Sequence, residues 1–471
     1  GNTLNLALES FKKEIKGKKA AVLGFGISNR PLAGTLADWG ASVTVFDKKK
    51  EEEFSDILPD YIERGIRFSL GENYLDNLKG FDIIFRTPGM RFDLPQITRA
   101  LDEGAELTSE IEEFVKLCPA KIYGITGSDG KTTTSTLIFR MLEEQGYNCY
   151  LGGNIGTPLF DKLDGINPDD RVVLELSSFQ LHTMKDSPHV AVITNITPNH
   201  LDVHKSMEEY IDAKKNIFRY QTPAGRVVLN ADNAITAGFL SEVPGKPVLF
   251  SNREEVICGA FLRNSRIVYR DDSEVDILPI EKIKLPGMHN VENLMAAISA
   301  VMPEVSIDTI RHVAQTFEGV EHRIEFVREI DGVSFYNDSI GSSPTRTIAS
   351  LKAFSRKVIL IAGGYDKNLS YDELGEVLHN HASALVLMGN TAHKIEQAYR
   401  KYIYAIGAEP VPVIHVSKME AAVAEAFSIA GSGDIVLLSP ASASFDLYSN
   451  FMERGNHFKD IVNGLTGKKK K

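Results

Sequence analysis

Short apolar runs alternate along the chain with segments whose apolar residues recur at helical spacing. This alternation predicts βαβ units and mostly parallel sheets. It occurs in three successive blocks, so we expect an α/β protein with domains over residues 1–109, 110–319 and 320–471. The runs that we expect to form strands are 19–24, 42–47, 81–85, 121–126, 172–176, 190–195, 357–362, 384–388, 412–416 and 434–438.

Composition narrows the class of protein. The 471 residues suit three domains, because a domain usually has about 150 residues. The formal charge of −11 argues against broad nucleic-acid binding, although a local pocket for an anion is compatible with it. The cysteines Cys118, Cys149 and Cys258 are far apart, so we expect neither structural disulfides nor a zinc site. No apolar stretch approaches the roughly 20 residues of a membrane span, and the N-terminus does not resemble a signal peptide. We therefore expect a cytoplasmic protein.

The segment 124–133, GITGSDGKTT, is the strongest candidate for chemistry. A predicted strand leads into a Gly-rich turn and then a helix, which directs backbone N–H groups at a phosphate. Lys131 can reach the β- and γ-phosphates, and the Thr132 hydroxyl can bind Mg²⁺. Ile125 stands where the strict P-loop pattern has its first glycine, and the alternative is an ordinary Gly-rich turn. The predicted nucleotide-binding residues are Gly127, Ser128, Asp129, Gly130, Lys131, Thr132 and Thr133.

Glu175, within a later predicted strand, and His200, after the next one, are candidate partners of this turn. A P-loop needs an acid for its metal ion, usually at the end of a neighbouring strand. Glu175 lies in an apolar run, where an unpaired charge is costly, so we predict a metal ligand rather than a strand-edge carboxylate. His200 follows the next strand, but a single loop histidine is more often a surface residue.

Lys214 lies in a helix predicted over 206–220, which opens with a capping box formed by Ser206 and Glu209. The residues one helical turn away from it are apolar, which places Lys214 in the centre of the buried stripe. They are Tyr210, Ile211, Ile217 and Phe218. A buried lysine has a lowered pKa, and its neutral amine can add CO₂ to form a carbamate that binds a second Mg²⁺. The alternative is a lysine whose ammonium group reaches solvent at the rim of the stripe, and spacing alone does not separate the two.

Weaker patterns occur in the outer blocks. Residues 24–29, GFGISN, with Asp47 at the end of the next strand, resemble a dinucleotide fingerprint in which Asn29 replaces the third glycine. A phosphate-bearing nucleotide is a safer inference there than NAD. In the third block, polar clusters at 337–339, 363–367 and 439–445 follow predicted strands. Ligands of open α/β sheets bind at such strand ends, although turns use the same residue types.

Together these motifs resemble those of the Mur ligase family, in family order over essentially the whole chain. They are GITGSDGKTT (124–133), GGNIG (152–156), LELSSFQL (174–181), NHLD (199–202), DAK (212–214), PGMHNVEN (286–293), EHR (321–323), NDS (337–339) and SPASASFD (439–446). The resemblance implies an N-terminal Rossmann-like domain for a UDP-bearing substrate, a central P-loop ATPase domain with a mostly parallel sheet, and a C-terminal Rossmann-like domain for an amino acid.

The resemblance also implies roles for individual residues. Contacts to the UDP-substrate would come from Ile27, Ser28, Asp47, Thr87, Asn154 and Gln180. Beyond the P-loop, ATP would meet Asn290, Asn293, Arg323 and Asp338. The metal ligands would be Thr132, Glu175, His200 and a carbamylated Lys214, the last three forming the catalytic set with Lys131. The amino-acid pocket would be lined by Ser342, Lys367, Ser444, Phe445 and Phe451.

The activity implied by the resemblance is the ATP-dependent addition of D-glutamate to UDP-N-acetylmuramoyl-L-alanine through an acyl phosphate, in cytoplasmic peptidoglycan precursor synthesis. Its cofactors would be two Mg²⁺ ions, with Mn²⁺ as a substitute, and the carbamate formed from CO₂. We expect a monomer that binds these small molecules, without nucleic acid or membrane.

Two alternatives stay open. One is a ligase of the same mechanism with another acceptor, such as L-glutamate, because Ile340 replaces a lysine found in many glutamate-adding members. The other is a non-catalytic ATP sensor on this scaffold. The presence of Lys131, Glu175, His200 and Lys214 together argues against the sensor.

Overall fold

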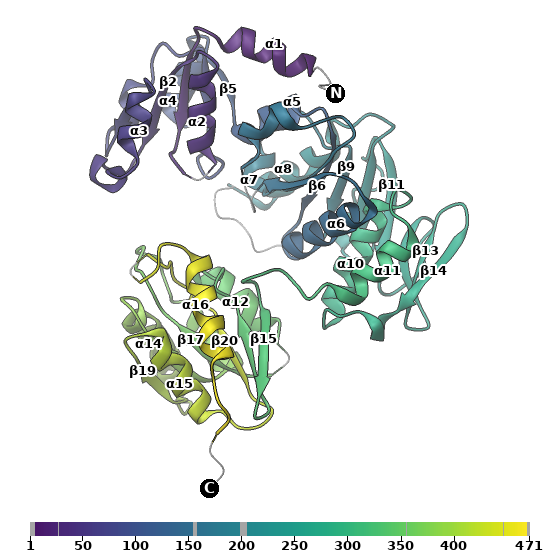
Figure 1. Cartoon of the computed structure of the whole chain (residues 1–471), viewed down its shortest axis with the longest axis vertical. Helices are drawn as coiled ribbons and strands as arrows, with labels where there is room; N and C mark the ends of the chain where they lie inside the picture. The colour runs from purple at the N-terminus through teal and green to yellow at the C-terminus, as the bar shows by residue number, and fades with distance from the viewer. Residues whose placement is uncertain are drawn as a thin grey trace. The chain divides into compact units, whose positions relative to one another are not determined.

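The structure is a computed structural model, which describes residues 5–26, 28–153, 158–197, 205–354, 356–445 and 447–468. The chain divides into two compact units, Gly1–Phe317 and Glu318–Lys471. In Figure 1 the first unit is coloured purple to green and the second green to yellow. All three sheets are wholly or mostly parallel, which confirms the predicted α/β class. The domain boundaries expected at 109/110 and 319/320 stay predictions.

The N-terminal domain is a parallel sheet with helices on both faces. Its elements are α1 (Leu6–Ile15), β1 (Lys19–Leu23), α2 (Asn29–Asp38), β2 (Ser42–Asp47), η1 (Glu51–Phe54), α3 (Leu58–Glu63), β3 (Arg67–Leu70), η2 (Tyr74–Asn77), β4 (Ile83–Phe85), α4 (Pro95–Asp102) and β5 (Glu106–Thr108). The strand order is β3-β2-β1-β4-β5. Ala20 and Val22 of β1 join the core under α2, whereas Ala21 and Leu23 join the core under α4. The strand order reverses at β1, so the loops after β1 and β4 border the crevice where such sheets bind ligands.

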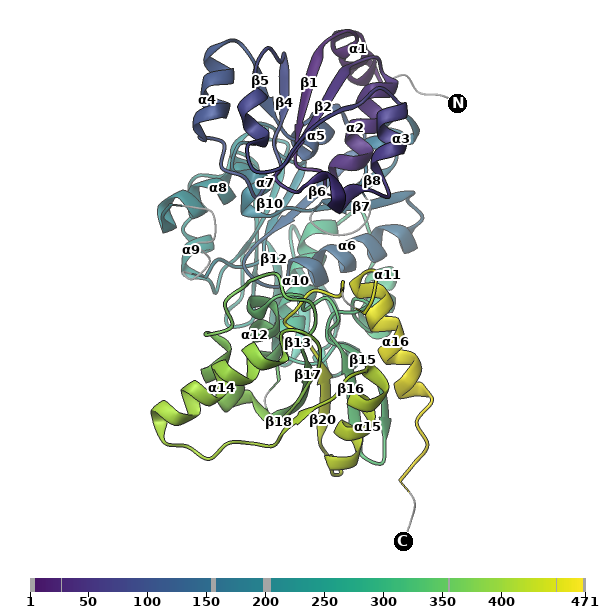
Figure 2. The ribbon, with the colours of Figure 1, turned by 90° about the vertical axis from the view of Figure 1, so that its left-hand side faces the viewer.

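The middle domain is built on a larger sheet with the order β14-β13-β12-β11-β10-β9-β6-β8-β7. Its strands are β6 (Lys121–Thr126), β7 (Cys149–Gly153), β8 (Arg171–Glu175), β9 (Val190–Ile193), β10 (Arg226–Asn230), β11 (Lys246–Ser251), β12 (Gly259–Arg263), β13 (Arg266–Arg270) and β14 (Glu274–Pro279). Its helices are α5 (Glu110–Leu117), α6 (Lys131–Gln145), η3 (Phe160–Gly165), α7 (Ser178–Leu181), α8 (Met207–Arg219), α9 (Ala234–Ala237), η4 (Ile280–Lys282), α10 (Met288–Val301) and α11 (Ile307–Thr316). Pairing is parallel from β7 to β12 and antiparallel from β12 to β14. Helices α6 and α10 lie side by side (Figure 2).

The second unit holds the third domain, whose sheet has the order β15-β16-β20-β17-β18-β19. Its elements are β15 (Glu325–Ile330), β16 (Val333–Asn337), α12 (Pro344–Lys352), β17 (Val358–Ala362), α13 (Leu374–His381), β18 (Ala382–Leu387), α14 (Ala392–Ile406), β19 (Val413–His415), α15 (Met419–Ile429), β20 (Ile435–Leu438) and α16 (Phe451–Asn463). Only β15 pairs antiparallel among these strands. Because β20 lies between β16 and β17, the loops after these three strands meet at one edge of the sheet.

The N-terminal and middle domains share one hydrophobic core within the first unit. Trp39, just after α2, packs on Phe160 of η3 with the ring centroids 5.5 Å apart. At the same junction Lys12 Nζ donates to Asp164 Oδ1 at 2.5 Å. None of the helices within the described ranges is long and apolar enough to cross a membrane.

Phe160→Ala should destabilise the first unit. The Phe160 side chain is fully buried, and loss of a buried phenylalanine costs about 3–5 kcal/mol. Trp39 is the only tryptophan of the chain, so its fluorescence during urea unfolding reports on this junction. Ile257→Ala, at a residue that is 90% exposed, is the control and should change the free energy of unfolding by no more than about 0.5 kcal/mol. Equal effects of the two variants would contradict the shared core.

Candidate active site

The turn after β6 is fixed by the two residues that follow β9. The Ser128 N–H donates to the Asn195 carbonyl and the Asp129 N–H to Asn195 Oδ1, both at 2.9 Å. The Thr194 hydroxyl donates to the Asp129 carbonyl at 2.6 Å. Gly127 has a φ of +147°, and a Cβ there would lie 1.9 Å from Thr194 Oγ1, so only glycine fits. Sequence reasoning missed Thr194 and Asn195, although their place after a buried strand was a usable signal.

Helix α6 begins at Lys131, directly after Gly130, which takes the left-handed conformation. A Cβ at Gly130 would lie 2.3 Å from Asn293 Oδ1 on α10. The same Asn293 atom accepts from the Thr134 hydroxyl at 3.3 Å, and Asn293 Nδ2 donates to Asn290 Oδ1 at 3.2 Å. The structure therefore brings both predicted asparagines next to the P-loop helix, whose N-terminal N–H groups suit a phosphate.

Thr132 and Glu175 form a buried oxygen pair. The Thr132 hydroxyl donates to Glu175 Oε2 at 3.0 Å, and both side chains are buried. Hydroxyl and carboxylate oxygens, completed by phosphate oxygens and water, are the ligands that Mg²⁺ prefers. Among the described residues, no group of three His, Cys, Asp or Glu side chains is arranged to hold a metal ion. The pair by itself fits a magnesium ion that is shared with a nucleotide.

Lys214 of α8 is only 1% exposed, which confirms its predicted place on the buried stripe and makes the rim alternative wrong. Its Nζ donates to Thr126 Oγ1 at 3.1 Å and lies 5.0 Å from the centroid of the Tyr210 ring. Burial lowers the pKa of Lys214 well below its ordinary value, the nearby Lys131 lowers it further, and Asp129 acts in the opposite direction. The neutral amine that a carbamate requires is therefore favoured.

The predicted capping box of α8 is correct in one half only. Ser206 Oγ accepts from the Glu209 N–H at 3.1 Å, as expected. The Glu209 carboxylate, however, accepts from the Lys205 N–H and pairs with Arg91 of the N-terminal domain. A guanidinium gives a stronger, two-pronged bond than a single backbone N–H, which explains the exchange of partner.

Predicted substrate residues of the N-terminal domain gather at the end of β1. The Asp47 carboxylate accepts from the Phe25 N–H at 2.8 Å, and Asn29 Nδ2 donates to the Gly24 carbonyl at 2.9 Å. Asn29, in the place of the third glycine, therefore braces the turn. Gly24 lies against Thr87, since a Cβ there would be 3.1 Å from Thr87 Cβ. Asp47 and Thr87 thus border the crevice.

The other residues predicted for this substrate have separate positions. Ser28 precedes α2 and makes no side-chain cap. Gln180 lies in α7 of the middle domain, where its Oε1 accepts from the Ser177 N–H at 2.9 Å. Ile27 and Asn154, together with the predicted metal ligand His200, lie outside the described residues.

The third domain buries a carboxyl group at the end of β16. Asp338 is 1% exposed, accepts from Ser439 Oγ at 2.6 Å and from the Ile324 N–H at 3.1 Å. Burial raises the pKa of Asp338 to about 6. The positive charge of the neighbouring Arg323 lowers the pKa of Asp338, but this is the smallest of the effects on it.

Arg454 of α16, which sequence reasoning missed, joins two strand-end loops. Its guanidinium donates to the Ser339 carbonyl at 2.7 Å, to the Ser442 carbonyl at 2.9 Å and to the Ser342 hydroxyl at 3.2 Å. The signal for this contact in the sequence was weak, because Arg454 and Ser339 are more than 100 residues apart in the chain. Arg454 holds the loops after β16 and β20 together.

The residues predicted for the amino-acid pocket lie on these loops and beside them. Lys367 Nζ lies 5.3 Å from the centroid of the Phe445 ring, which is 59% exposed. Ser444 is buried next to it, and Phe451 begins α16. The N–H of Ile340, the residue that replaces the common lysine, donates to the His322 carbonyl at 3.1 Å.

A Rossmann-like sheet, a sheet that carries the P-loop and a third α/β sheet follow one another along the chain. Three family models match the chain in that order. They are the "Mur ligase MurD-like, N-terminal domain" at residues 18–109, the "Mur ligase middle domain" at 125–301, and the "Mur ligase, glutamate ligase domain" at 322–442. The chain belongs to the Mur ligase family, whose members are ATP-dependent amide-forming ligases.

Relatives and solved structures agree with this assignment. The UDP-N-acetylmuramoylalanine--D-glutamate ligase of Acetivibrio thermocellus is 57% identical over 98% of this chain and 100% of its own length. The enzyme of that name from Clostridium beijerinckii is 54% identical over 97% and 98%. The UDP-N-acetylmuramate-alanine ligase of Thermotoga maritima has a TM-score of 0.55 at 19% identity, over 95% of this chain and 99% of that one. This last similarity shows the fold alone.

Asp338→Asn should change the pH dependence of stability. Because the folded pKa of about 6 exceeds the ordinary value of 3.8, the folded state binds an extra proton between these values. The resulting stabilisation is complete below the ordinary value and is lost as the pH rises through the folded value. Asparagine cannot ionise, so the free energy of unfolding of the variant relative to wild type should rise by on the order of 3 kcal/mol from about pH 4 to 7. Denaturant unfolding of both proteins across this range is the measurement, and a constant difference would refute the burial argument.

Proposed function

We propose that this chain adds D-glutamate to UDP-N-acetylmuramoyl-L-alanine at the expense of ATP, in the cytoplasmic synthesis of peptidoglycan precursors. The observation that carries this proposal is the 57% identity over 98% of the chain to a relative named as that ligase. The buried Thr132–Glu175 pair beside the P-loop supports the use of ATP. We further propose that the protein acts as a monomer.

The proposed reaction has two steps. The alanyl carboxylate attacks the γ-phosphate of ATP, which gives an acyl phosphate and ADP. The amine of D-glutamate then attacks the acyl carbon, the carbon–oxygen bond to phosphate breaks, and the amine loses a proton. Phosphoryl transfer depends mainly on positioning and charge neutralisation, which Lys131 and the N-terminus of α6 supply.

Thr132 and Glu175 are the residues that would hold a magnesium ion. When bound, Mg²⁺ neutralises phosphate charge and orients the phosphate oxygens. Glu175 keeps its place for this role because the Thr132 hydroxyl donates to it inside the protein. His200 and a carbamate on Lys214 are proposed for a second ion, and the burial of the Lys214 amine supports the carbamate.

The remaining assignments are proposals that follow the family pattern. For the UDP-substrate we propose Ile27, Ser28, Asp47, Thr87, Asn154 and Gln180. For ATP we propose the P-loop with Asn290, Asn293, Arg323 and Asp338. For the amino acid we propose Ser342, Lys367, Ser444, Phe445 and Phe451.

Phosphate release should depend on D-glutamate. The assay contains ATP, Mg²⁺ and UDP-N-acetylmuramoyl-L-alanine, and compares D-glutamate, L-glutamate and no amino acid. We expect release only with D-glutamate, together with a product heavier by one glutamyl residue in mass spectrometry. Release with L-glutamate alone would mean that the mechanism is as proposed but the acceptor is L-glutamate. This arm is included because Ile340 replaces a lysine found in many glutamate-adding members.

Lys131→Ala distinguishes the enzyme from a sensor. Removal of the phosphate-facing ammonium should lower kcat roughly 100- to 1,000-fold, since one such electrostatic contact has an effect of this size. A Lys131→Ala variant that still supports growth of cells lacking the wild-type protein would favour the non-catalytic alternative.

Lys214→Arg should lower kcat by roughly 100-fold or more, because arginine keeps the charge but cannot form a carbamate. Lys215→Arg is the matched control, since the neighbouring Lys215 pairs with Glu242 at the surface of the helix. A carbamate signal in ¹³C NMR with labelled bicarbonate should be present in wild type and absent from Lys214→Arg. Near-normal turnover of Lys214→Arg would refute the carbamate.

A further inference from the structure

The segment between β4 and α4, residues 86–94, reaches from the N-terminal domain to the middle domain with two arginines. We call it the β4–α4 segment. Arg86 is 2% exposed, and it donates to Thr183 Oγ1 at 3.1 Å and to the Phe179 carbonyl, both next to or within α7. Arg91 reaches Glu209 of α8. One short segment therefore contacts α7, which follows β8, and α8, which follows β9.

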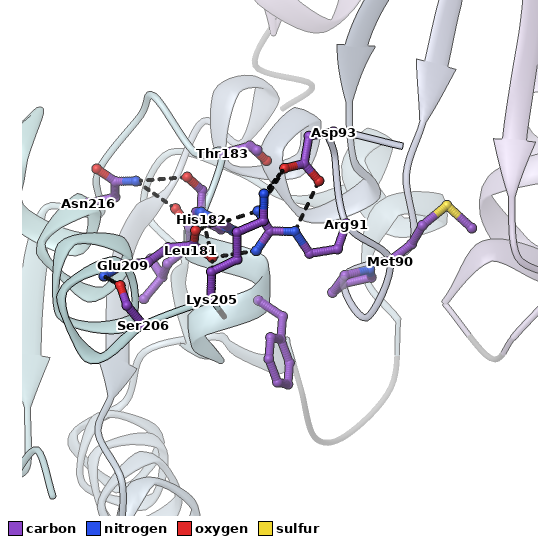
Figure 3. A network of polar contacts seen from close by, with 12 residues as sticks. Met90, Arg91, Asp93, Leu181, His182, Thr183, Lys205, Ser206, Glu209 and Asn216 are labelled. Atoms are coloured by element: carbon purple, nitrogen blue, oxygen red, sulfur yellow. Dashed lines mark hydrogen bonds and ion pairs between the residues drawn. The ribbon is translucent and has the colours of Figure 1, made fainter. Parts of the chain in front are cut away.

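Arg91 lies between two carboxylates, as Figure 3 shows. Its Nε and Nη2 donate to the two oxygens of Asp93 at 3.0 and 2.9 Å, and its guanidinium also bonds Glu209. Lys205 closes the cluster, since its Nζ donates to Asp93 at 2.9 Å and its N–H to Glu209 at 3.2 Å. His182 of the α7 turn packs edge-on against Phe92, which follows Arg91.

This cluster is partly withdrawn from water. The side chains of Arg91 and Glu209 are 17% and 23% exposed, and the bond to Arg91 lowers the pKa of Glu209 to about 2. A two-pronged arginine–carboxylate contact has a fixed geometry, in contrast to a solvated lysine pair. The Arg91–Glu209 contact therefore fixes the position of the α8 N-terminus relative to the β4–α4 segment.

The next turns of α8 face the P-loop. The Tyr210 hydroxyl lies 3.1 Å from Ser128 Oγ, within hydrogen-bond distance. Lys214, one turn further along the same helix, donates to Thr126 at the end of β6. A helix is rigid over this length, so a shift at Glu209 is transmitted to both contacts.

The other end of the β4–α4 segment faces the substrate crevice. The Arg86 guanidinium donates to the carbonyls of Thr87, Pro88 and Met90 and so shapes the turn that follows β4. Thr87 lies against the glycine turn after β1. The same segment therefore lines the crevice proposed for the UDP-substrate and contacts α8.

We propose that Arg91 is a positioning residue that couples the UDP-substrate crevice to α8, and so aligns Lys214 with the P-loop. In this proposal Arg91 acts through Glu209, with which it forms an ion pair. The catalytic part of this inference rests on the proposed function, whereas the mechanical part concerns α8 alone.

Arg91→Gln and Glu209→Gln test the two ends of the contact. Each should lower kcat roughly 10- to 100-fold, since small misplacements far from the chemistry have effects of this size, while the KM values for ATP and UDP-substrate change by about twofold or less. The double variant should be no slower than the worse single variant. Amide hydrogen exchange in α8 should become faster in all three.

Lys12→Gln is the matched control, because it breaks a separate ion pair between the same two domains, Lys12–Asp164, which does not touch α8. It should leave both kcat and exchange in α8 as in wild type. Equal effects of Lys12→Gln and Arg91→Gln would mean that the domains are merely loosened, and would overturn the proposal.

Two further results would overturn it. A raised KM for the UDP-substrate at unchanged kcat would make Arg91 a substrate contact, and additive losses in the double variant would separate Arg91 from Glu209. If Arg91→Gln does not fold, Glu209→Gln alone must still show the fall in kcat and the faster exchange. If wild type has no D-glutamate-dependent activity, the proposed function fails, while exchange in α8 still decides the mechanical coupling.

Discussion

The parallel register of β6 between β8 and β9 is the constraint on which the nucleotide site depends. Ile125 pairs with Glu175 of β8, and Thr126 pairs with Ile193 of β9. The P-loop therefore leaves the sheet between an acid on one side and a polar turn on the other. Since side chains alternate between faces, a slip by one residue would turn Glu175 away from the P-loop helix and Thr126 away from Lys214. The backbone hydrogen bonds between these strands thus determine which side chains lie next to the P-loop.

The same register explains why the P-loop departs from its strict pattern. Ile125 stands at the position of the first glycine, yet it belongs to β6 and is fully buried there. An isoleucine suits a buried strand better than glycine does. The residues that need glycine are Gly127 and Gly130, where a Cβ would meet Thr194 or Asn293. The pattern specifies Gly130, whereas Gly127 stands at one of its unspecified positions.

Local patterns predicted the alternation of strands and helices, the P-loop, and the apolar stripe around Lys214, because these depend on neighbours within one or two turns. They did not identify β3, β5, β7 or the strands β10 to β16. They did not predict which distant side chains meet. Arg91 and Glu209 are 118 residues apart, and the capping-box rule assigned Glu209 to its own helix end. The partners of Asn195 and Arg454 were hidden for the same reason. Such contacts are decided by how strands are ordered in a sheet, which periodicity does not contain.

The gathering of three loops at the edge of the third sheet has a consequence for how this protein could diverge. The loops after β16, β17 and β20 come from different strands, whose buried residues belong to the cores under the helices. Ile340, Lys367 and Phe445 each lie on a different loop. If the proposed acceptor pocket lies at these loops, a single codon change on one loop would alter one wall of it while the remaining walls and both cores are inherited intact.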